Sequence, residues 1–264
     1  MVINPVDKEQ LRHQFLNASP IRFFKVDNFL EPAFAEQVVN AYPTFEEAKA
    51  QGRLFTALNE KGKVQITDSA LFPPPIKQLS DYLNSQDWLD TLGYITDMPN
   101  LLADVKLNGG GIHETGPQGH LDVHVDFNTH KETKWFRRLN ILVYMNKNWQ
   151  EDWGGNVELW DPEVRHLQGS FSPIFNRCVV FNTTEESYHG VSAVKCPADT
   201  MRKSYAAYYY TVDAPVEWSG KVHGTIFKAR PDEYFKGTFL MPANNAKKWL
   251  KGAVGSLKKT LKGE

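Results

Sequence analysis

Residues 119–128 of the chain read GHLDVHVDFN, an unbroken alternation of polar and apolar side chains. In a β-strand, residues two apart point to the same face, so this pattern predicts a strand with two unlike faces. The polar face would carry His120, Asp122, His124 and Asp126, and the apolar face Leu121, Val123, Val125 and Phe127. Two imidazoles and two carboxylates on one face favour a metal site or a proton-transfer site, with a solvated polar face as the alternative.

Short apolar runs surround this stretch between about residues 101 and 212. The candidate strands are residues 104–112, 119–126, 138–145, 156–160, 165–170, 177–181, 188–193 and 203–212. Turn-forming sequences separate them, where a sharp bend or a positive φ costs little: Gly109-Gly110-Gly111, Gly116-Pro117, Gly154-Gly155 and Asn182-Thr183-Thr184. Eight short strands at this spacing predict an all-β sandwich or jelly roll.

The first hundred residues have a different character and are expected to be mixed and mostly helical. The expected elements are a helix capped by Asp7, a strand at 21–26, helices at 31–42 and 76–83, and a helix that starts near Trp88. We therefore expect residues 1–102 to form a support region beside the β-rich core.

The end of the chain differs again. Residues 247–262 place apolar side chains on one face of a predicted helix and lysines on the other. Such a helix either packs on the domain with its lysines in water or lies on an anionic membrane surface. We accordingly expect a core at 103–212 and an extension at 213–264.

Composition excludes several classes of protein. The chain has 264 residues, 41% of them hydrophobic, which suits one large domain with appendages. Its net charge of −1 gives no reason to expect a nucleic-acid partner. Cys178 and Cys196 are too few for a disulfide framework and match no zinc motif. No apolar run approaches the ~18 residues of a membrane span, and no signal-peptide pattern is seen, so a cytoplasmic location is expected. The oligomeric state is left open.

A third imidazole comes from far along the chain. His189 lies in Tyr188-His189-Gly190, after the predicted strand at 177–181 and a turn. Two imidazoles and one carboxylate occupy one face of an octahedron and leave three positions open, as in the facial triad of non-haem Fe(II) oxygenases. Spacing alone does not decide whether the His-x-Asp pair is His120/Asp122 or His124/Asp126.

A cation for a carboxylate follows at the start of the last predicted strand. In Arg202-Lys203-Ser204, Arg202 and Ser204 share a strand face. 2-Oxoglutarate chelates iron through its keto-acid end, so its far carboxylate needs a fixed partner, and the planar guanidinium of Arg binds carboxylates in bidentate fashion. Tyr144 is a further candidate donor to that carboxylate.

The combination His124-x-Asp126, His189 and Arg202-x-Ser204 resembles the 2-oxoglutarate/Fe(II) dioxygenase superfamily, and is similar in particular to its prolyl 4-hydroxylase-like branch. The stretches that carry the resemblance are GGGIH (109–113), HVDFNTH (124–130), RRLNILVYMN (137–146), WGGNVELW (153–160) and SYHGV (187–191). They lie within about residues 103–212, less than half of the chain.

The resemblance implies a fold, a ligand set and cofactors. The fold would be mainly β with flanking helices: a double-stranded β-helix, a cupin-like jelly roll, with N-terminal helices packed on the major sheet. The aromatic-Asn pair that follows the ligand Asp in the family selects His124 and Asp126, with His189, as iron ligands. Arg202, Ser204, Tyr144 and His113 would line the 2-oxoglutarate pocket. The implied cofactors are Fe(II), 2-oxoglutarate and O₂, with ascorbate as a candidate reductant.

The implied activity is hydroxylation of an unactivated C–H bond in a peptidyl proline, another side chain or a small metabolite. Arg137 and Trp153 are candidate substrate contacts, because Arg137 lies on a strand near the site and Trp153 flanks the Gly154-Gly155 turn. Two other hypotheses stand beside it. One is a jelly-roll metalloprotein with different chemistry, such as a cupin-like isomerase or an oxygenase independent of 2-oxoglutarate. The other is a non-catalytic binding module that retains a metal site.

Overall fold

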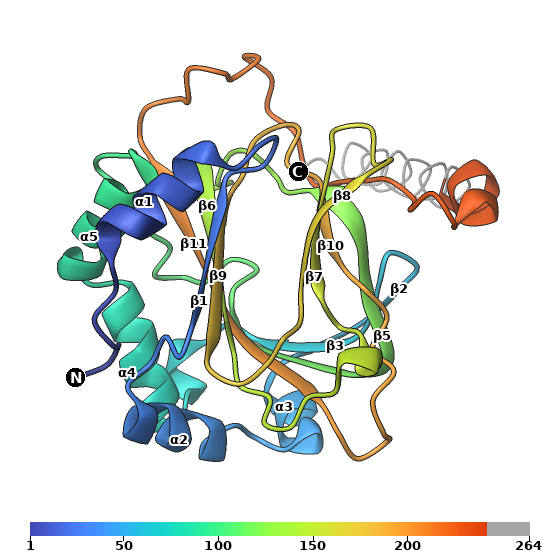
Figure 1. Ribbon diagram of the computed structural model, residues 1–264. Coiled ribbons are helices and arrows are strands. Elements are labelled where there is room, and N and C mark those ends of the chain that lie inside the picture. The colour runs from blue at the N-terminus through green and yellow to red at the C-terminus, as the bar shows by residue number, and fades with distance from the viewer. Residues whose placement is uncertain (242–264) are drawn as a thin grey trace, which may run out of the picture.

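The structure is a computed structural model that describes residues 1–241 (Figure 1). The predicted helix at 247–262, with its membrane-surface alternative, lies outside the described residues. The helices are α1 (Lys8–Asn17), α2 (Pro32–Asn40), α3 (Phe45–Gln51), α4 (Pro74–Leu83) and α5 (Gln86–Thr96). The strands are β1 (Phe23–Asp27), β2 (Arg53–Ala57), β3 (Glu60–Ile66), β4 (Leu102–Ala103), β5 (Gly111–Val125), β6 (Phe136–Tyr144), β7 (Val157–Trp160), β8 (Leu167–Phe171), β9 (Arg177–Asn182), β10 (His189–Val191), β11 (Arg202–Thr211) and β12 (Ile226–Phe227).

The strands form one curled antiparallel sheet with the order β1-β9-β6-β11-β5-β10-β7-β8. The long strand β5 turns the sheet back on itself. Its first part, Gly111 to Thr115, pairs with β11, and its second part, Leu121 to His124, pairs with β10. One strand therefore belongs to both walls, and the interior between the walls is where a site can form (Figure 1).

The N-terminal helices pack on the wall made by β9, β6 and β11 (Figure 1). Alternation decides which side chains meet them. Ile141, Val143, Tyr205 and Tyr209 point toward the helices, and they join Trp88 and other helical residues in the main core. Their neighbours Tyr144, Val179 and Phe181 belong to a second, smaller core between the walls. The expected packing of helices on the major sheet is thus confirmed.

Several expected elements form as the sequence indicated. Asp7 caps α1, where its side chain accepts a hydrogen bond of 2.9 Å from the backbone N–H of Gln10. The predicted strand at 21–26 corresponds to β1, and the helices expected at 31–42 and 76–83 correspond to α2 and α4.

Other expectations were wrong. Residues 104–110 form a turn instead of a strand, because the Asp104 carboxylate accepts hydrogen bonds from the backbone N–H groups of Lys106 and Asn108. The expected break at Gly116-Pro117 lies inside β5, which runs on from Gly111 to Val125. The hairpin of β2 and β3 was not foreseen in a region expected to be mostly helical. Its side chains are mixed in polarity, and it pairs with β5 instead of forming a sheet of its own.

Within residues 1–241, none of the helices combines the length and the apolar character needed to cross a lipid bilayer.

Candidate metal centre

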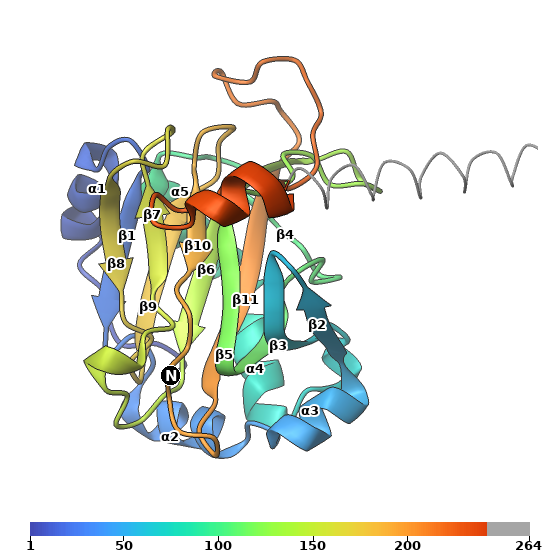
Figure 2. The same ribbon diagram turned by 90° about the vertical axis from the view of Figure 1, so that its right-hand side faces the viewer.

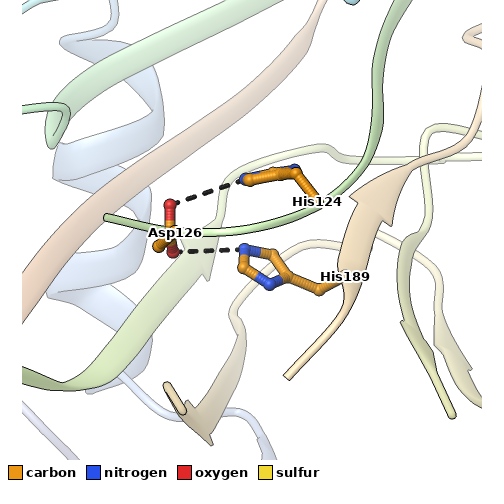
Figure 3. Close-up of side chains that lie close together, drawn as sticks. All are labelled: His124, Asp126 and His189. Carbon is orange, nitrogen blue, oxygen red and sulfur yellow. Dashed lines mark ion pairs between the residues drawn. The ribbon is translucent and has the colours of Figure 1, made fainter. Parts of the chain in front are cut away.

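Three potential metal ligands converge at one end of the space between the walls (Figure 3). His124 near the end of β5 and His189 at the start of β10 are direct partners in the antiparallel register. Asp126 follows β5 by one residue and turns its carboxylate toward both rings. Its Oδ1 lies 3.5 Å from Nε2 of His124, and its Oδ2 lies 3.3 Å from Nε2 of His189. One donor atom from each of the three residues lies within 4.8 Å of the others.

Both imidazoles are held in the tautomer that a metal needs. Nδ1 of His124 lies 2.8 Å from the carbonyl oxygen of Asp122, and Nδ1 of His189 lies 2.9 Å from that of Ser187. A carbonyl oxygen only accepts, so each Nδ1 carries a proton, and the neutral form of each ring presents its lone pair at Nε2. Burial, followed by the neighbouring His124, lowers the pKa of His189, which favours the neutral ring.

The carboxylate of Asp126 is held in its charged form. Burial on its own would raise the pKa of Asp126, but Arg137 and then the two histidines hold it well below its usual value. Nη2 of Arg137 lies 3.0 Å from Oδ2 of Asp126. Nδ2 of Asn140 donates a hydrogen bond of 2.8 Å to the same oxygen. A buried anion beside two neutral imidazole lone pairs is a donor set that suits Fe(II).

A single cavity joins these residues to the predicted co-substrate residues. It is lined by the three potential ligands and also by His113, Arg202 and Ser204. The cross-strand register explains this grouping, since Ser204 of β11 pairs with both His113 of β5 and Tyr144 of β6. These residues alternate with side chains that face the helical layer, so all of them point inward.

Arg202 is a buried cation with no carboxylate beside it among the described residues. Its guanidinium donates to the carbonyl of Gly155 at 2.6 Å, and lies 3.3 Å from Oγ of Ser204 and 3.3 Å from the hydroxyl of Tyr144. Burial lowers the pKa of Arg202. A buried charge is costly unless it is paired, so the carboxylate of a dicarboxylate would be a favourable partner for Arg202. The residues present therefore fit both a metal ion and 2-oxoglutarate.

The other predicted site residues lie in varied places. His113 lines the cavity, and burial keeps its pKa well below the usual value, so its ring is neutral. Arg137 is buried against Asp126 and Asn140, with its guanidinium 3.6 Å from the ring centre of Tyr208. Trp153 does not line the cavity but packs edge-on against Trp149. The roles assigned to these residues stay predictions.

The strict alternation expected for residues 119–128 was wrong in its middle. Leu121 lines the same cavity as His120 and His124, although it was expected on the opposite face. The register with β10 shifts between Leu121 and His124. This irregularity turns Asp122 away from the cavity, toward Lys236. A β-bulge re-aims side chains in this way and is common beside active sites.

Sequence reasoning missed Asn140, Thr115, Lys63 and Tyr208. Asn140 sits between Asp126 and Arg137, and the other three line the cavity. Asn140 carried a signal, because it is a polar residue inside the apolar strand at 138–145. Lys63 carried none, since its place depends on the unforeseen hairpin.

Comparison with known proteins agrees with this geometry. Residues 110–210 match the family model of the 2OG-Fe(II) oxygenase superfamily. Mouse prolyl 3-hydroxylase OGFOD1 is 33% identical over 79 residues, which are 28% of this chain and 14% of the mouse protein. The matched segment is thus a small part of that relative's length.

Two solved structures share the fold. A Trichoplax adhaerens prolyl hydroxylase, in complex with a hypoxia inducible factor peptide fragment, aligns with a TM-score of 0.55 at 19% identity over 77% of this chain and 88% of its own. The carbocyclase SnoK from nogalamycin biosynthesis aligns with a TM-score of 0.55 at 10% identity over 88% of this chain and 93% of its own. The expected double-stranded β-helix is confirmed.

Proposed function

We propose that this protein, whose residues 110–210 match the 2OG-Fe(II) oxygenase superfamily model, is an Fe(II)- and 2-oxoglutarate-dependent hydroxylase of an unactivated C–H bond. His124, Asp126 and His189 would hold the iron, and Arg202 would hold the far carboxylate of 2-oxoglutarate. The observation that carries the proposal is that a His-Asp-His cluster and a buried guanidinium without a carboxylate partner line the same cavity. A metalloprotein that does not use 2-oxoglutarate would need no buried cation such as Arg202 in this cavity.

Each residue would contribute through its position and charge. When bound, Fe(II) with 2-oxoglutarate and O₂ supplies the oxidising chemistry that places a hydroxyl on carbon. His124 and His189 would offer Nε2 lone pairs, and Asp126 would offset one of the two positive charges of Fe(II). Arg202, Ser204 and the hydroxyl of Tyr144 would fix the co-substrate at its far end by hydrogen bonds. Burial raises the pKa of Tyr144 to about 12, so its hydroxyl keeps the proton that it donates.

For the substrate, we propose a peptidyl proline, another side chain or a small metabolite. The prolyl alternative is supported by the name of the mouse relative, a prolyl 3-hydroxylase, which matches this chain over a short segment. Fold similarity does not select among these substrates, because it extends both to a prolyl hydroxylase bound to a peptide and to a carbocyclase. A cytoplasmic location stays a prediction.

The test is anaerobic. Fe(II) and then 2-oxoglutarate are added to metal-free full-length protein, and the visible charge-transfer band of the chelate is recorded. We expect the band in the wild type and its loss in His189→Ala. If Fe(II) binds but the band does not form, the proposal is wrong, and a jelly-roll metalloprotein with different chemistry takes its place. Succinate release with proline-containing peptides, compared with free amino acids, then tests the substrate.

A further inference from the structure

The orientation of His124 depends on the carbonyl of Asp122, and Asp122 lies at the irregular point of β5. Its backbone N–H donates a hydrogen bond of 2.9 Å to the carbonyl of Asn59, in the turn between β2 and β3. Its side chain is fully buried, and one of its oxygens has no hydrogen-bond partner among the described residues. Where the ladder shifts register, strand pairing no longer fixes the carbonyl by itself, so other contacts must do so.

Those contacts come from the segment 226–236, which we call the C-terminal strap. Nζ of Lys236 lies 2.5 Å from Oδ1 of Asp122, and Nη1 of Arg230 lies 3.9 Å from the same oxygen. Arg230 also pairs with Glu158 of β7 at 2.8 Å. Figure 2 shows the strap lying against the strands on one side of the molecule, and Figure 1 shows the N-terminal helices on the other.

The strap also follows the backbone of β5 through the irregular stretch. The backbone N–H of Lys228 donates a hydrogen bond of 2.8 Å to the carbonyl of Val123. Phe227 is the cross-strand partner of His124, and the centres of their rings lie 5.4 Å apart. Together with Arg230 and Lys236, these contacts reach each residue from Leu121 to His124.

Arg230 fits tightly against β10 beside the other histidine. A Cβ at position 190, next to His189, would lie 3.1 Å from Nη2 of Arg230 and 2.9 Å from the carbonyl oxygen of Leu121. Glycine leaves the room that lets the strap approach the backbone of both ligand-bearing strands.

From these contacts we propose that Lys236 and Arg230 are positioning residues for the metal centre: they hold Asp122 so that its carbonyl orients His124. This inference rests on the proposed function, in which His124 is an iron ligand. It assigns a role in the site to a segment that lies beyond the family match at 110–210. Partners that orient a metal-bound imidazole typically affect metal affinity roughly 10–100-fold when they are lost.

The test measures Fe(II) affinity by anaerobic titration of metal-free full-length protein. We expect Lys236→Met to bind Fe(II) at least roughly 10-fold more weakly than the wild type. Lys236→Arg should recover most of the affinity, because it restores a cation next to Asp122. The matched control is Asp27→Asn, which removes an ion pair with Arg177 between β1 and β9. The control should lose some stability and leave the metal affinity unchanged.

The results separate the two proposals. If Lys236→Met binds Fe(II) as tightly as the wild type, the strap proposal is overturned, while a chelate band in the wild type still supports the hydroxylase. If wild-type protein binds Fe(II) without forming the 2-oxoglutarate chelate band, the proposed function is wrong. The Fe(II) affinities of the Lys236 variants then still test whether the strap positions the metal centre. Equal weakening in Lys236→Met and Asp27→Asn would also overturn it, because general destabilisation would then explain both. Phe227→Leu gives a second variant at the strap with no charge change.

Discussion

Nδ2 of Asn140 donates a hydrogen bond of 2.8 Å to Oδ2 of Asp126. The same oxygen also faces Arg137, whose guanidinium contacts the amide oxygen of Asn140 at 2.8 and 3.1 Å. The side chains of Asp126, Arg137 and Asn140 therefore form a network in which each contacts the other two. Oδ2 is engaged by these donors, while Oδ1 points toward His124. We infer that the network fixes the orientation of the Asp126 carboxylate beside the two histidines and keeps it charged.

Arg137→Met tests this arrangement. The variant leaves a buried carboxylate without its cation, so we expect the pKa of Asp126 to rise and Fe(II) affinity to fall roughly 10–100-fold. Anaerobic titration of metal-free protein measures the change. Arg138→Met is the matched control, because Arg138 is the next residue and contacts Thr211 instead. Unchanged Fe(II) affinity in Arg137→Met would return Arg137 to its sequence-based role as a substrate contact.

His124→Ala and His120→Ala distinguish the two His-x-Asp pairs. We expect His124→Ala to lose Fe(II) binding, since its Nε2 faces Asp126. His120→Ala should bind Fe(II) like the wild type, because Nε2 of His120 is directed at the carbonyl of Leu58, 3.2 Å away. Thermal denaturation of each apoprotein checks that both variants fold. The opposite pattern of metal binding would show that the ligand pair is wrong.

Arg202→Met tests the co-substrate anchor. Loss of one partner from a buried charge pair typically costs about 2–5 kcal/mol, so the apparent KM for 2-oxoglutarate should rise by roughly 30-fold or more. Fe(II) binding without 2-oxoglutarate should change little. Lys203→Met is the control, since Lys203 is the next residue on β11 and its side chain lies over Tyr42, outside the cavity. An unchanged dependence on 2-oxoglutarate in Arg202→Met would remove Arg202 from the site.

Glu114 makes the stability of the fold depend on pH. Its side chain is fully buried, and neither carboxylate oxygen has a hydrogen-bond partner among the described residues. Burial raises the pKa of Glu114 from 4.5 to about 7. A carboxyl group with a raised pKa in the folded state binds its proton more tightly there, so the protein loses stability as the pH rises from about 4.5 to about 7. The loss levels off above that range, at no more than about 3 kcal/mol.

Glu114→Gln removes this dependence. We expect the free energy of unfolding of the wild type to fall relative to that of Glu114→Gln between pH 5 and pH 8, as measured by urea denaturation. Glu46→Gln, on the exposed side of α3, is the control. Parallel pH dependences in the wild type and Glu114→Gln would contradict the assignment.

Much of the fold and of the candidate site was predictable because side-chain alternation in a strand is a local property. The period of two placed Arg202 and Ser204 on one face, and the apolar runs located most strands of the core to within a few residues. Two imidazoles and a carboxylate also predicted a metal site, and the structure brings the three side chains together. These inferences need only the chain direction and the residue types.

The tertiary structure decided which of these residues meet and what holds them. The shifted register near Leu121 arises from the pairing of β5 with β10, so alternation along β5 alone could not reveal it. The sequence was compatible with Arg137 as a substrate contact, and only the curled sheet shows that its guanidinium lies against Asp126. Lys236 reaches Asp122 across 114 positions in the chain. Such contacts depend on how distant segments pack around one core. The periodicity of a sequence determines which side chains share a face of a strand, but only tertiary packing determines which other segment that face contacts.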